Sequence, residues 1–287
     1  MEVVIVDDGS TDATCSVVEA WRSTAPFAVR FLRKRREGPG PARDFGVRNS
    51  RGEIIAFTDS DCAPARGWLT AAVTALAGAG LVTGPIELER PPDTHFFFNS
   101  QLDRQDHDRG LYRTANLVLP RDVYLAVGGF DRGFAYAGED ADLGWRVRAA
   151  GGVAVFAPDA GVTHLATPMR LGDWLRKPLE FAVLPRLVAR HPQIRRTALF
   201  ARYFLSRWQF LFDVAIAGVA LAFLTRWWLL LLLAVPWFVA CAEVWLEMAR
   251  LGRLHKALAI QLLLIERYAL GLAVLMWSSV RNRTVVL

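Results

Sequence analysis

The chain has 287 residues, a formal net charge of +6 and 53% hydrophobic residues, so it is long enough for one large domain or two modest ones. Its three cysteines, Cys15, Cys62 and Cys241, are widely spaced, which excludes a disulfide framework and a cysteine metal site and indicates a reducing compartment. The positive charge favours acidic partners. We expect phosphate-bearing ligands and anionic lipid headgroups as these partners, and no nucleic acid.

Strand-like and helix-like patterns alternate over the first half of the chain. Strands are predicted at 2–7, 27–32, 53–58, 81–88, 116–119 and 153–156, and helices after Asp12 and at 42–49, 64–77 and 142–149. The run Gly38-Pro39-Gly40-Pro41 predicts a loop, and the polar segment 91–113 predicts a long loop or irregular helix. This alternation predicts an α/β domain with a buried first strand and a parallel, doubly wound sheet.

Two clusters of acidic residues follow predicted strands. Asp7-Asp8 ends the first strand, and Asp59-Ser60-Asp61 comes directly after the third. Ligands of such sheets bind beyond the carboxyl ends of the strands. Two carboxylates at i and i+2 can face one hard divalent cation, although acidic turns are common without one.

The C-terminal part of the chain is dominated by apolar residues. Three membrane spans are predicted, at about 209–224, 227–246 and 257–280, with tryptophans near their ends as in an aromatic belt. The first is short for a span, and Arg226 divides the first two, so a hairpin or a re-entrant pair also fits. The preceding segment, 168–208, is rich in arginine and predicts amphipathic helices on the membrane surface. The expected domains are therefore 1–167, 168–208 and 209–287.

The distribution of cations predicts the orientation of these spans. One cluster precedes the first span (Arg195, Arg196, Arg202, Arg207), and another separates the second and third spans (Arg250, Arg253, Lys256). Cytoplasmic loops carry the excess of such residues. The sequence thus predicts a multi-pass protein of the cell (inner) membrane with its first domain in the cytoplasm. Arg281 and Arg283 would then lie outside, against the rule.

Five separated motifs occur in one order along the first domain. They are Val6-Asp7-Asp8-Gly9-Ser10-Thr11-Asp12, Gly38-Pro39 with Ala42-Arg43, the segment 51–61 ending in Asp59-Ser60-Asp61, Gly128-Gly129-Phe130-Asp131, and Gly138-Glu139-Asp140-Ala141-Asp142-Leu143 with Arg146. Together they resemble the family 2 glycosyltransferases of the GT-A fold, a Rossmann-like nucleotide-diphospho-sugar transferase fold, over about residues 2–165. The resemblance implies a UDP- or GDP-sugar donor, a Mn²⁺ or Mg²⁺ ion on its diphosphate, and transfer with inversion at the anomeric carbon.

The resemblance also implies a role for each motif. Nucleotide-sugar binding falls to Asp7, Asp8, Arg43 and Asp59, and metal binding to Asp59, Asp61 and His164. Asp140 is implied to be the base that deprotonates the acceptor hydroxyl, with Glu139, Gly128 and Gly129 bordering the acceptor. With the apolar helices, the implied acceptor is a lipid-linked or cell-envelope glycan, and membrane lipids are expected partners. Asp44 stands where many relatives have Asn, so its role is open.

Plainer interpretations of these residues remain. Asp7 can cap its own turn, Arg43 can be a solvated loop residue, and a lone histidine such as His164 is often a structural hydrogen-bonding group. Asp142 is most simply a first-turn helix residue favoured by the helix dipole.

One departure concerns the start of the chain. Family members usually have a further strand and helix before the segment that begins here at Glu2. Either the chain is truncated or its start is misassigned, or the sheet is genuinely incomplete. We therefore expect an N-terminally truncated GT-A domain that, as given, is less stable and binds its donor weakly.

Two other functions are compatible with the sequence. A processive polysaccharide synthase usually carries a Gln-x-x-Arg-Trp motif, but Arg207-Trp208 lacks a glutamine at the required distance. A membrane scaffold derived from an impaired transferase fits the short N-terminus, whereas Asp59, Asp61 and Asp140 argue against it.

Overall fold

The computed structural model describes residues 1–89, 105–134, 137–165, 169–250 and 252–287. The chain forms two compact units, Met1–Pro92 with Gln101–Thr167 and Asp93–Ser100 with Pro168–Leu287. The predicted loop at 91–113 falls largely outside the described residues, which resume at Gln105.

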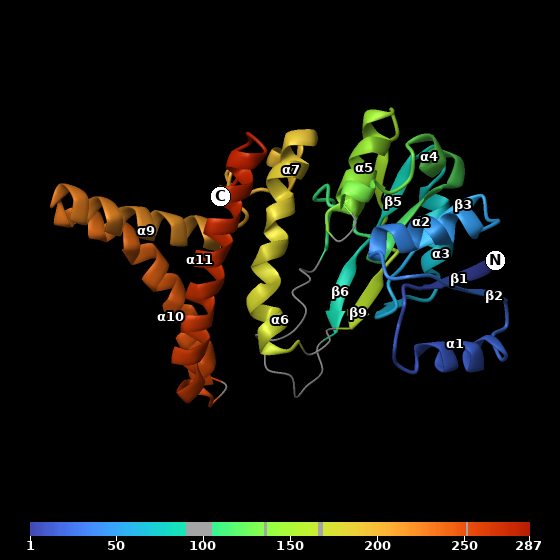
Figure 1. Cartoon of the computed structure of the whole chain (residues 1–287), viewed down its shortest axis with the longest axis horizontal. Coiled ribbons are helices and arrows are strands. Elements are labelled where there is room, and N and C mark those ends of the chain that lie inside the picture. Colours follow the sequence, from blue (N-terminus) through green and yellow to red (C-terminus); the bar gives the residue numbers. More distant parts are fainter. Residues whose placement is uncertain (90–104, 135–136, 166–168, 251) are drawn as a thin grey trace. The chain divides into compact units, whose positions relative to one another are not determined.

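The described part of the first unit contains three small sheets (Figure 1). β1 (Glu2–Asp7) and β2 (Ala28–Arg33) form a parallel pair. The four-stranded sheet has the order β3 (Ile54–Phe57), β7 (Leu117–Pro120), β5 (Leu81–Thr83), β8 (Ala154–Phe156). The third sheet has the order β4 (Cys62–Pro64), β9 (Val162–Leu165), β6 (Ile86–Glu89).

The expectation of one parallel sheet is wrong. β7 is antiparallel to both β3 and β5, and β4 is antiparallel to β9, whereas β5–β8 and β6–β9 are parallel. The single strand predicted at 81–88 is also wrong, because Gly84-Pro85 divides it between two sheets. A side chain at Gly84 would lie 2.1 Å from the Ala160 carbonyl oxygen, so glycine permits a close approach of two backbone segments there. In β1, predicted as buried, only Asp7 is buried.

The main helices of the first unit are α1 (Thr14–Arg22), α2 (Pro39–Asn49), α3 (Trp68–Ala75), α4 (Arg121–Ala126) and α5 (Glu139–Ala149), with short 3₁₀ helices at Thr114–Asn116 and Arg132–Phe134. The predicted loop at 38–41 is wrong, because α2 already begins at Pro39. Gly38 precedes it with φ +99°, and a proline in the first turn loses no helical hydrogen bond. Asp12 accepts a hydrogen bond from the Thr14 amide, but Ala13 is the N-cap of α1.

A hydrophobic core lies beside the four-stranded sheet and holds the chain segments that adjoin it. Trp68, Ala72, Val82 and Val162 are among its buried residues. Asn116 is buried beside this core, and both ends of its side-chain amide are hydrogen-bonded. Its Nδ2 donates to the Pro85 and Ala160 carbonyls at 3.0 and 2.7 Å. Its Oδ1 accepts from Trp68 Nε1 at 2.9 Å. This amide therefore ties α3, β6 and the approach to β9 together.

The second unit is helical. It comprises α6 (Leu171–Arg176), the 3₁₀ helix η3 (Lys177–Ala182), α7 (Val183–Arg190), α8 (Ile194–Thr197), α9 (Arg207–Thr225), η4 (Trp228–Ala234), α10 (Val235–Arg250), η5 (Leu254–Lys256) and α11 (Ala257–Arg281). Among the residues that the structure describes, three stretches are long and apolar enough to cross a membrane: Arg207–Thr225, Trp228–Arg250 and Leu254–Arg281. They coincide with the three predicted apolar segments and indicate membrane association.

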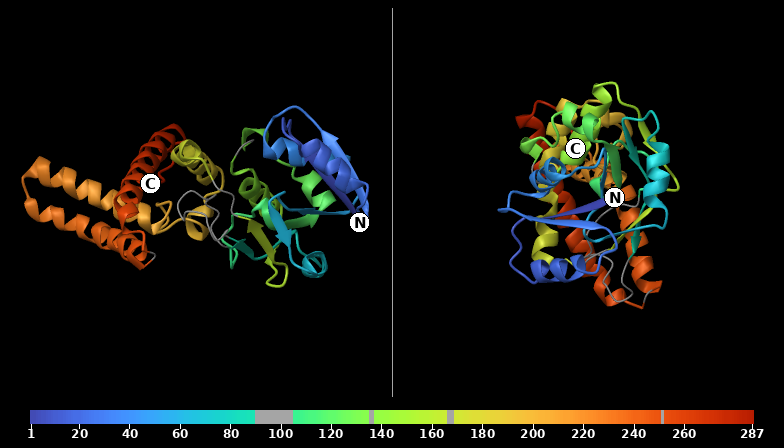
Figure 2. Two further views of the ribbon diagram at one scale, coloured as in Figure 1. Left: turned by 90° about the horizontal axis from the view of Figure 1, so that it is seen from below. Right: turned by 90° about the vertical axis from the view of Figure 1, so that its right-hand side faces the viewer.

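α9 and the stretch η4–α10 run side by side from a shared turn (Figure 2). Phe212, Trp237 and Tyr268 form the small aromatic core where these helices meet α11, with ring centroids 5.2–5.8 Å apart. Toward the shared turn the side chains lose protein neighbours, and Leu224 and Leu229 are 80% and 74% exposed. Such exposure of large apolar residues indicates an apolar surrounding medium.

Candidate active site

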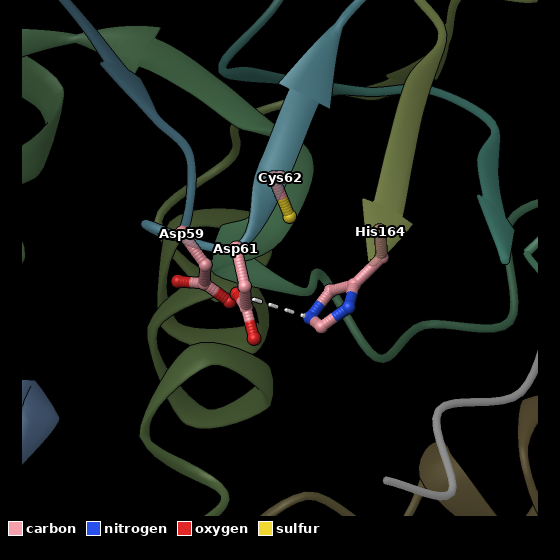
Figure 3. Close-up of side chains that lie close together, drawn as sticks. All are labelled: Asp59, Asp61, Cys62 and His164. Carbon is pink, nitrogen blue, oxygen red and sulfur yellow. Dashed lines mark ion pairs between the residues drawn. The ribbon is translucent and has the colours of Figure 1, made fainter. Parts of the chain in front are cut away.

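Asp59, Asp61, Cys62 and His164 form a compact cluster (Figure 3). One potential ligand atom from each residue lies within 4.8 Å of the others. His164 Nε2 is 3.4 Å from an Asp61 carboxylate oxygen. Two carboxylates and an imidazole are a ligand set that suits Mn²⁺ or Mg²⁺.

The backbone explains why these residues converge. After β3 the chain makes a tight turn in which the Cys62 amide donates to the Asp59 carbonyl at 3.1 Å. β4 then pairs with β9 in a register that places Cys62 opposite His164. The Leu165 amide also donates to the Asp61 carbonyl at 2.8 Å. Residues about a hundred positions apart are thus held together by main-chain hydrogen bonds.

The environment of His164 suits a metal ligand. Its Nδ1 lies 3.2 Å from the Leu165 carbonyl oxygen, which can accept a hydrogen bond from Nδ1. In the neutral tautomer that makes this hydrogen bond, Nε2, which faces Asp61, carries the lone pair that a metal ion needs. Burial raises the pKa of the Cys62 thiol to about 11, so this side chain is a neutral neighbour of the carboxylates. The donor set for a hard cation is therefore Asp59, Asp61 and His164.

Arg43 connects this cluster with helix α5. Its guanidinium donates to an Asp59 oxygen at 2.7 Å and to a Glu139 oxygen at 2.8 Å. The side chain is mostly buried, which excludes the interpretation of a solvated loop arginine. Arg43 lies within α2, so the helix backbone fixes its position.

Glu139 and Asp140 begin α5 after Gly138, which has φ +76°. Glu139 is buried and Asp140 is half-buried. Burial raises the pKa of both carboxyls, and repulsion from Asp140 adds to the rise at Glu139, whereas Arg43 opposes both shifts. The charge of Arg113 also lowers the pKa of Asp140, so Arg113 is near a site to which no sequence motif assigned it. An acid whose pKa is raised toward neutrality suits proton transfer.

The loop that contains Gly128 and Gly129, here called the glycine loop, contacts helices α5 and α2. Arg146 of α5 donates to the carbonyl oxygens of Val127 and Gly129 at 2.5 and 2.6 Å, and to Asp142 at 2.8 Å. Asp142 is fully buried, so it is more than a first-turn residue favoured by the dipole. A side chain at Gly129 would lie 2.6 Å from Asp44 Oδ1, and Gly129 has φ +68°. The positive φ, which side-chain-bearing residues rarely adopt, therefore favours glycine there, and the close approach of Asp44 adds to this preference.

Asp44, whose role the sequence left open, has a defined place. It accepts from the Tyr124 hydroxyl at 2.9 Å and pairs with Arg48 at 2.7 Å. Tyr124 in turn accepts from the Phe130 amide of the glycine loop at 3.2 Å. The pairs Asp44–Arg48 and Asp142–Arg146 are both spaced i to i+4, a spacing that can indicate an ion pair on one helix. Only the fold shows that both pairs support the glycine loop.

Asp7 and Asp8 lie at the end of β1, where each already has partners. Asp7 is buried, accepts from the Ser10 amide at 2.8 Å and pairs with Arg33. The hydrogen bonds from Ser10 hold the pKa of Asp7 below its usual value. Asp8 accepts from the amides of Glu37 and Gly38, just before α2. Among the described residues, no hydrogen bond or ion pair joins either carboxylate to the cluster of Asp59, Asp61 and His164.

The first unit is a mixed α/β unit with acidic side chains beyond its strand ends and a pair of carboxyls at the start of α5, an architecture of the GT-A type. The sequence matches the family described as glycosyl transferase family 2 over residues 1–131 and the glycosyl transferase family group 2 over residues 93–242. The chain belongs to the family 2 glycosyltransferases.

Curated relatives and solved structures agree with this assignment. Glycosyltransferase AglE of Haloferax volcanii is 32% identical over 186 residues, which are 61% of this chain and 60% of that protein. Pre-mycofactocin glycosyltransferase of Mycobacterium tuberculosis is 30% identical over 208 residues, 67% of this chain and 43% of that protein. The mannosyltransferase PcManGT of Pyrobaculum calidifontis, solved with GDP-Man and Mn²⁺, is 21% identical with a TM-score of 0.53, covering 98% of this chain and 77% of that one. This chain thus spans less than two thirds of both curated relatives, and the structural likeness shows the fold.

Proposed function

We propose that this protein is an inverting glycosyltransferase that moves a sugar from a UDP- or GDP-sugar to a hydroxyl group of a membrane-associated acceptor. The observation that carries this proposal is the placement of Asp59, Asp61 and His164 beside the Arg43–Glu139 pair. It joins a ligand set for a hard cation to carboxyls with raised pKa values. Family membership supports the reaction class.

The residues divide the work by their chemistry. Asp59, Asp61 and His164 would hold Mn²⁺ or Mg²⁺, which when bound neutralises the charge of the departing nucleoside diphosphate. Arg43 donates hydrogen bonds to Asp59 and to Glu139 at the same time, and this bridge keeps Asp59 oriented. Asp140 takes the proton of the acceptor hydroxyl as that oxygen bonds to the anomeric carbon and the bond to the diphosphate breaks. Attack opposite the leaving group inverts the anomeric centre.

The donor and acceptor sites extend from this centre. Asp7 and Asp8 belong to the nucleotide side, and their fixed positions beside Ser10 and Gly38 present a preorganised turn to the base and ribose. Glu139, Gly128 and Gly129 belong to the acceptor side. The apolar helices of the second unit support a reaction at the cell (inner) membrane, and a lipid-linked or cell-envelope glycan is the acceptor class that fits such a location. The cationic clusters that flank the helices favour a cytoplasmic first unit.

The test is release of nucleoside diphosphate by the purified full chain in lipid nanodiscs, with a panel of UDP- and GDP-sugars. We expect release that depends on Mn²⁺ or Mg²⁺ and is lost in Asp61→Ala, while Arg22→Ala, a change on the exposed face of α1, retains it. Release by Asp61→Ala at the rate of the unmodified chain, or release that chelation of metal does not reduce, would contradict the proposed metal site. No release with any donor and membrane lipid would contradict the activity.

A further inference from the structure

Residues 285–287 are hydrogen-bonded to the segment that directly precedes α9. The Leu205 amide donates to the Leu287 carbonyl at 2.6 Å, and the Leu287 amide donates to the Tyr203 carbonyl at 2.7 Å. Arg195 also donates to the Val285 carbonyl at 2.8 Å. Backbone groups in direct contact lie on the same side of a bilayer. The end of α11 and the beginning of α9 therefore share one side.

This contact is incompatible with three crossings. If α9, α10 and α11 each crossed the membrane, the residues after α11 would face the side opposite to those before α9. The number of crossings must be even, so the crossing helices are at most two of the three.

One face of α11 is covered by helical segments that hydrocarbon would not accommodate. The Arg267 guanidinium lies 5.4 Å from the ring centre of Trp174 and 5.5 Å from that of Phe181, and Ser278 Oγ donates to the Ala182 carbonyl at 2.6 Å. The covering stretch, 171–190, carries several charged residues (Asp173, Arg176, Lys177, Glu180, Arg186, Arg190). Charged side chains are costly at the centre of a bilayer and usual at its surface.

The opposite face of α11 presents a narrow apolar stripe. Its exposed large residues are Leu258, Leu262, Ile265, Met276, Trp277 and Val280, and all of them except Trp277 follow the spacing of one helical face. Both ends of the helix carry cations, Arg253 and Lys256 before it and Arg281 and Arg283 at its end. A helix that is covered on one side by a charged stretch, exposes apolar residues on the other side and has cationic ends suits the plane of the membrane surface.

α9 and the stretch η4–α10 have the properties of a hairpin across the bilayer. The 19 residues of α9 rise about 28 Å, close to the roughly 30 Å of a hydrocarbon core. Arg226 turns the chain in the left-handed conformation, φ +59°, and is followed by the exposed Trp227 and Trp228. Arginine and tryptophan are the residue types found at a membrane–water interface.

We propose that α9 and α10 cross the bilayer as a hairpin whose turn at Arg226 reaches the far surface, while α11 lies along the near surface. Residues 285–287 then face the same side as the first unit, because only a few residues connect Thr167 to α6. Arg281 and Arg283 join the clusters at Arg195 and Arg253 on that side, which removes the conflict that three crossings create with the distribution of cations. This topology requires membrane association but does not depend on the proposed catalytic activity.

The topology can be tested by labelling cysteine variants of the full chain with a membrane-impermeant maleimide. Arg226→Cys probes the turn, Val285→Cys probes the last residues, and Val17→Cys, on exposed α1, marks the side of the first unit. The unmodified chain, with Cys15, Cys62 and Cys241, gives the background. In intact spheroplasts of a bacterial host we expect labelling of Arg226→Cys only. Permeabilisation restores the labelling of Val285→Cys and Val17→Cys.

The outcomes separate this topology from the proposed function. Labelling of Val285→Cys on the side opposite to Val17→Cys overturns the hairpin in favour of an odd number of crossings. Protection of Arg226→Cys together with Val17→Cys overturns the crossing itself. Labelling of Val285→Cys and Val17→Cys in intact spheroplasts, with Arg226→Cys protected, supports the hairpin and contradicts only the cytoplasmic orientation of the proposed function.

Discussion

Glu139 and Asp140 share the first turn of α5, and burial raises the pKa of both carboxyls. A base acts only when it is ionised, so a raised pKa means that activity is lost earlier as the pH falls. We expect kcat at saturating donor and acceptor to increase with pH through the pKa of the pair and then to level off. Glu139→Gln removes a neighbouring negative charge and should move this acidic limb to lower pH. The pH profiles of kcat for both proteins measure the shift.

The same experiment can contradict the assignment of Asp140. An acidic limb that stays in place in Glu139→Gln would mean that the titrating group is not coupled to this carboxyl pair. Asp140→Asn serves as the reference, because it lacks an ionisable side chain at the proposed base and should leave only a small, pH-independent rate.

His164 and Cys62 stand opposite each other in the β4–β9 pair but should contribute unequally to the metal site. A hard cation prefers oxygen and imidazole nitrogen to a thiol. We expect His164→Ala to weaken Mn²⁺ binding about tenfold, or roughly 1.4 kcal/mol. Cys62→Ser, which conserves size at the adjacent position, should leave binding close to that of the unmodified chain. Calorimetric titration with Mn²⁺ measures both, and equal losses in the two variants would place the thiol among the ligands.

At the scale of elements, Arg146 joins α5 to the glycine loop through two carbonyls and Asp142. Lysine keeps the charge but cannot reproduce three hydrogen bonds from one planar group. We therefore expect Arg146→Lys to raise the KM for the acceptor severalfold and to leave the KM for the donor nearly unchanged, because the loop borders the proposed acceptor side. Steady-state kinetics with each substrate varied in turn provide the measurement.

A general loss of stability would give a different result. Arg22→Lys, an equivalent change on the exposed surface of α1, is the matched control and should alter neither KM. If Arg146→Lys lowers the amount of active enzyme while both KM values stay unchanged, the arginine supports the fold without positioning the acceptor loop.

The elements also show what the sequence can predict. Strand and helix positions follow from apolar runs, so β1, β2, β3, β7 and β8 lie close to their predicted positions. Pairing does not follow from such runs: Leu81–Glu89 contributes to two sheets because of a close backbone approach at Gly84, which no local pattern reveals. The start of α2 was missed because proline was interpreted as a loop former, although it is also favoured in a first helical turn.

In the candidate site too, the sequence predicts some features and only the fold reveals the others. Motifs identified Asp59, Asp61, Glu139 and Asp140, and the structure places Asp59 and Asp61 beside His164. That convergence depends on β4, which has three residues, too few to show periodicity, and on its register with β9. The bridge from Arg43 to Glu139 spans 96 positions and likewise required the fold.

At the scale of the whole molecule, charge and apolar surface are separated along the chain. Cations concentrate at Arg195–Arg207, at Arg250–Lys256 and after α11, whereas the stretch from Phe210 to Leu246 carries few charged residues. Its exposed apolar side chains extend along both arms of the hairpin, from Ile216 to Val239. This separation favours insertion of the hairpin and retention of its flanking cations at the surface.

Phe238 lies near the middle of the returning arm and is 68% exposed. A lysine at the centre of a membrane helix costs about 3 kcal/mol, or roughly a 100-fold change in partition. We expect the unmodified chain to stay with the membranes during carbonate extraction and Phe238→Lys to be released in larger part. Val17→Lys adds the same charge at a similarly exposed position of the first unit and should stay with the membranes. Equal retention of all three proteins would show that this arm does not contact hydrocarbon, because a charge there would then carry no cost.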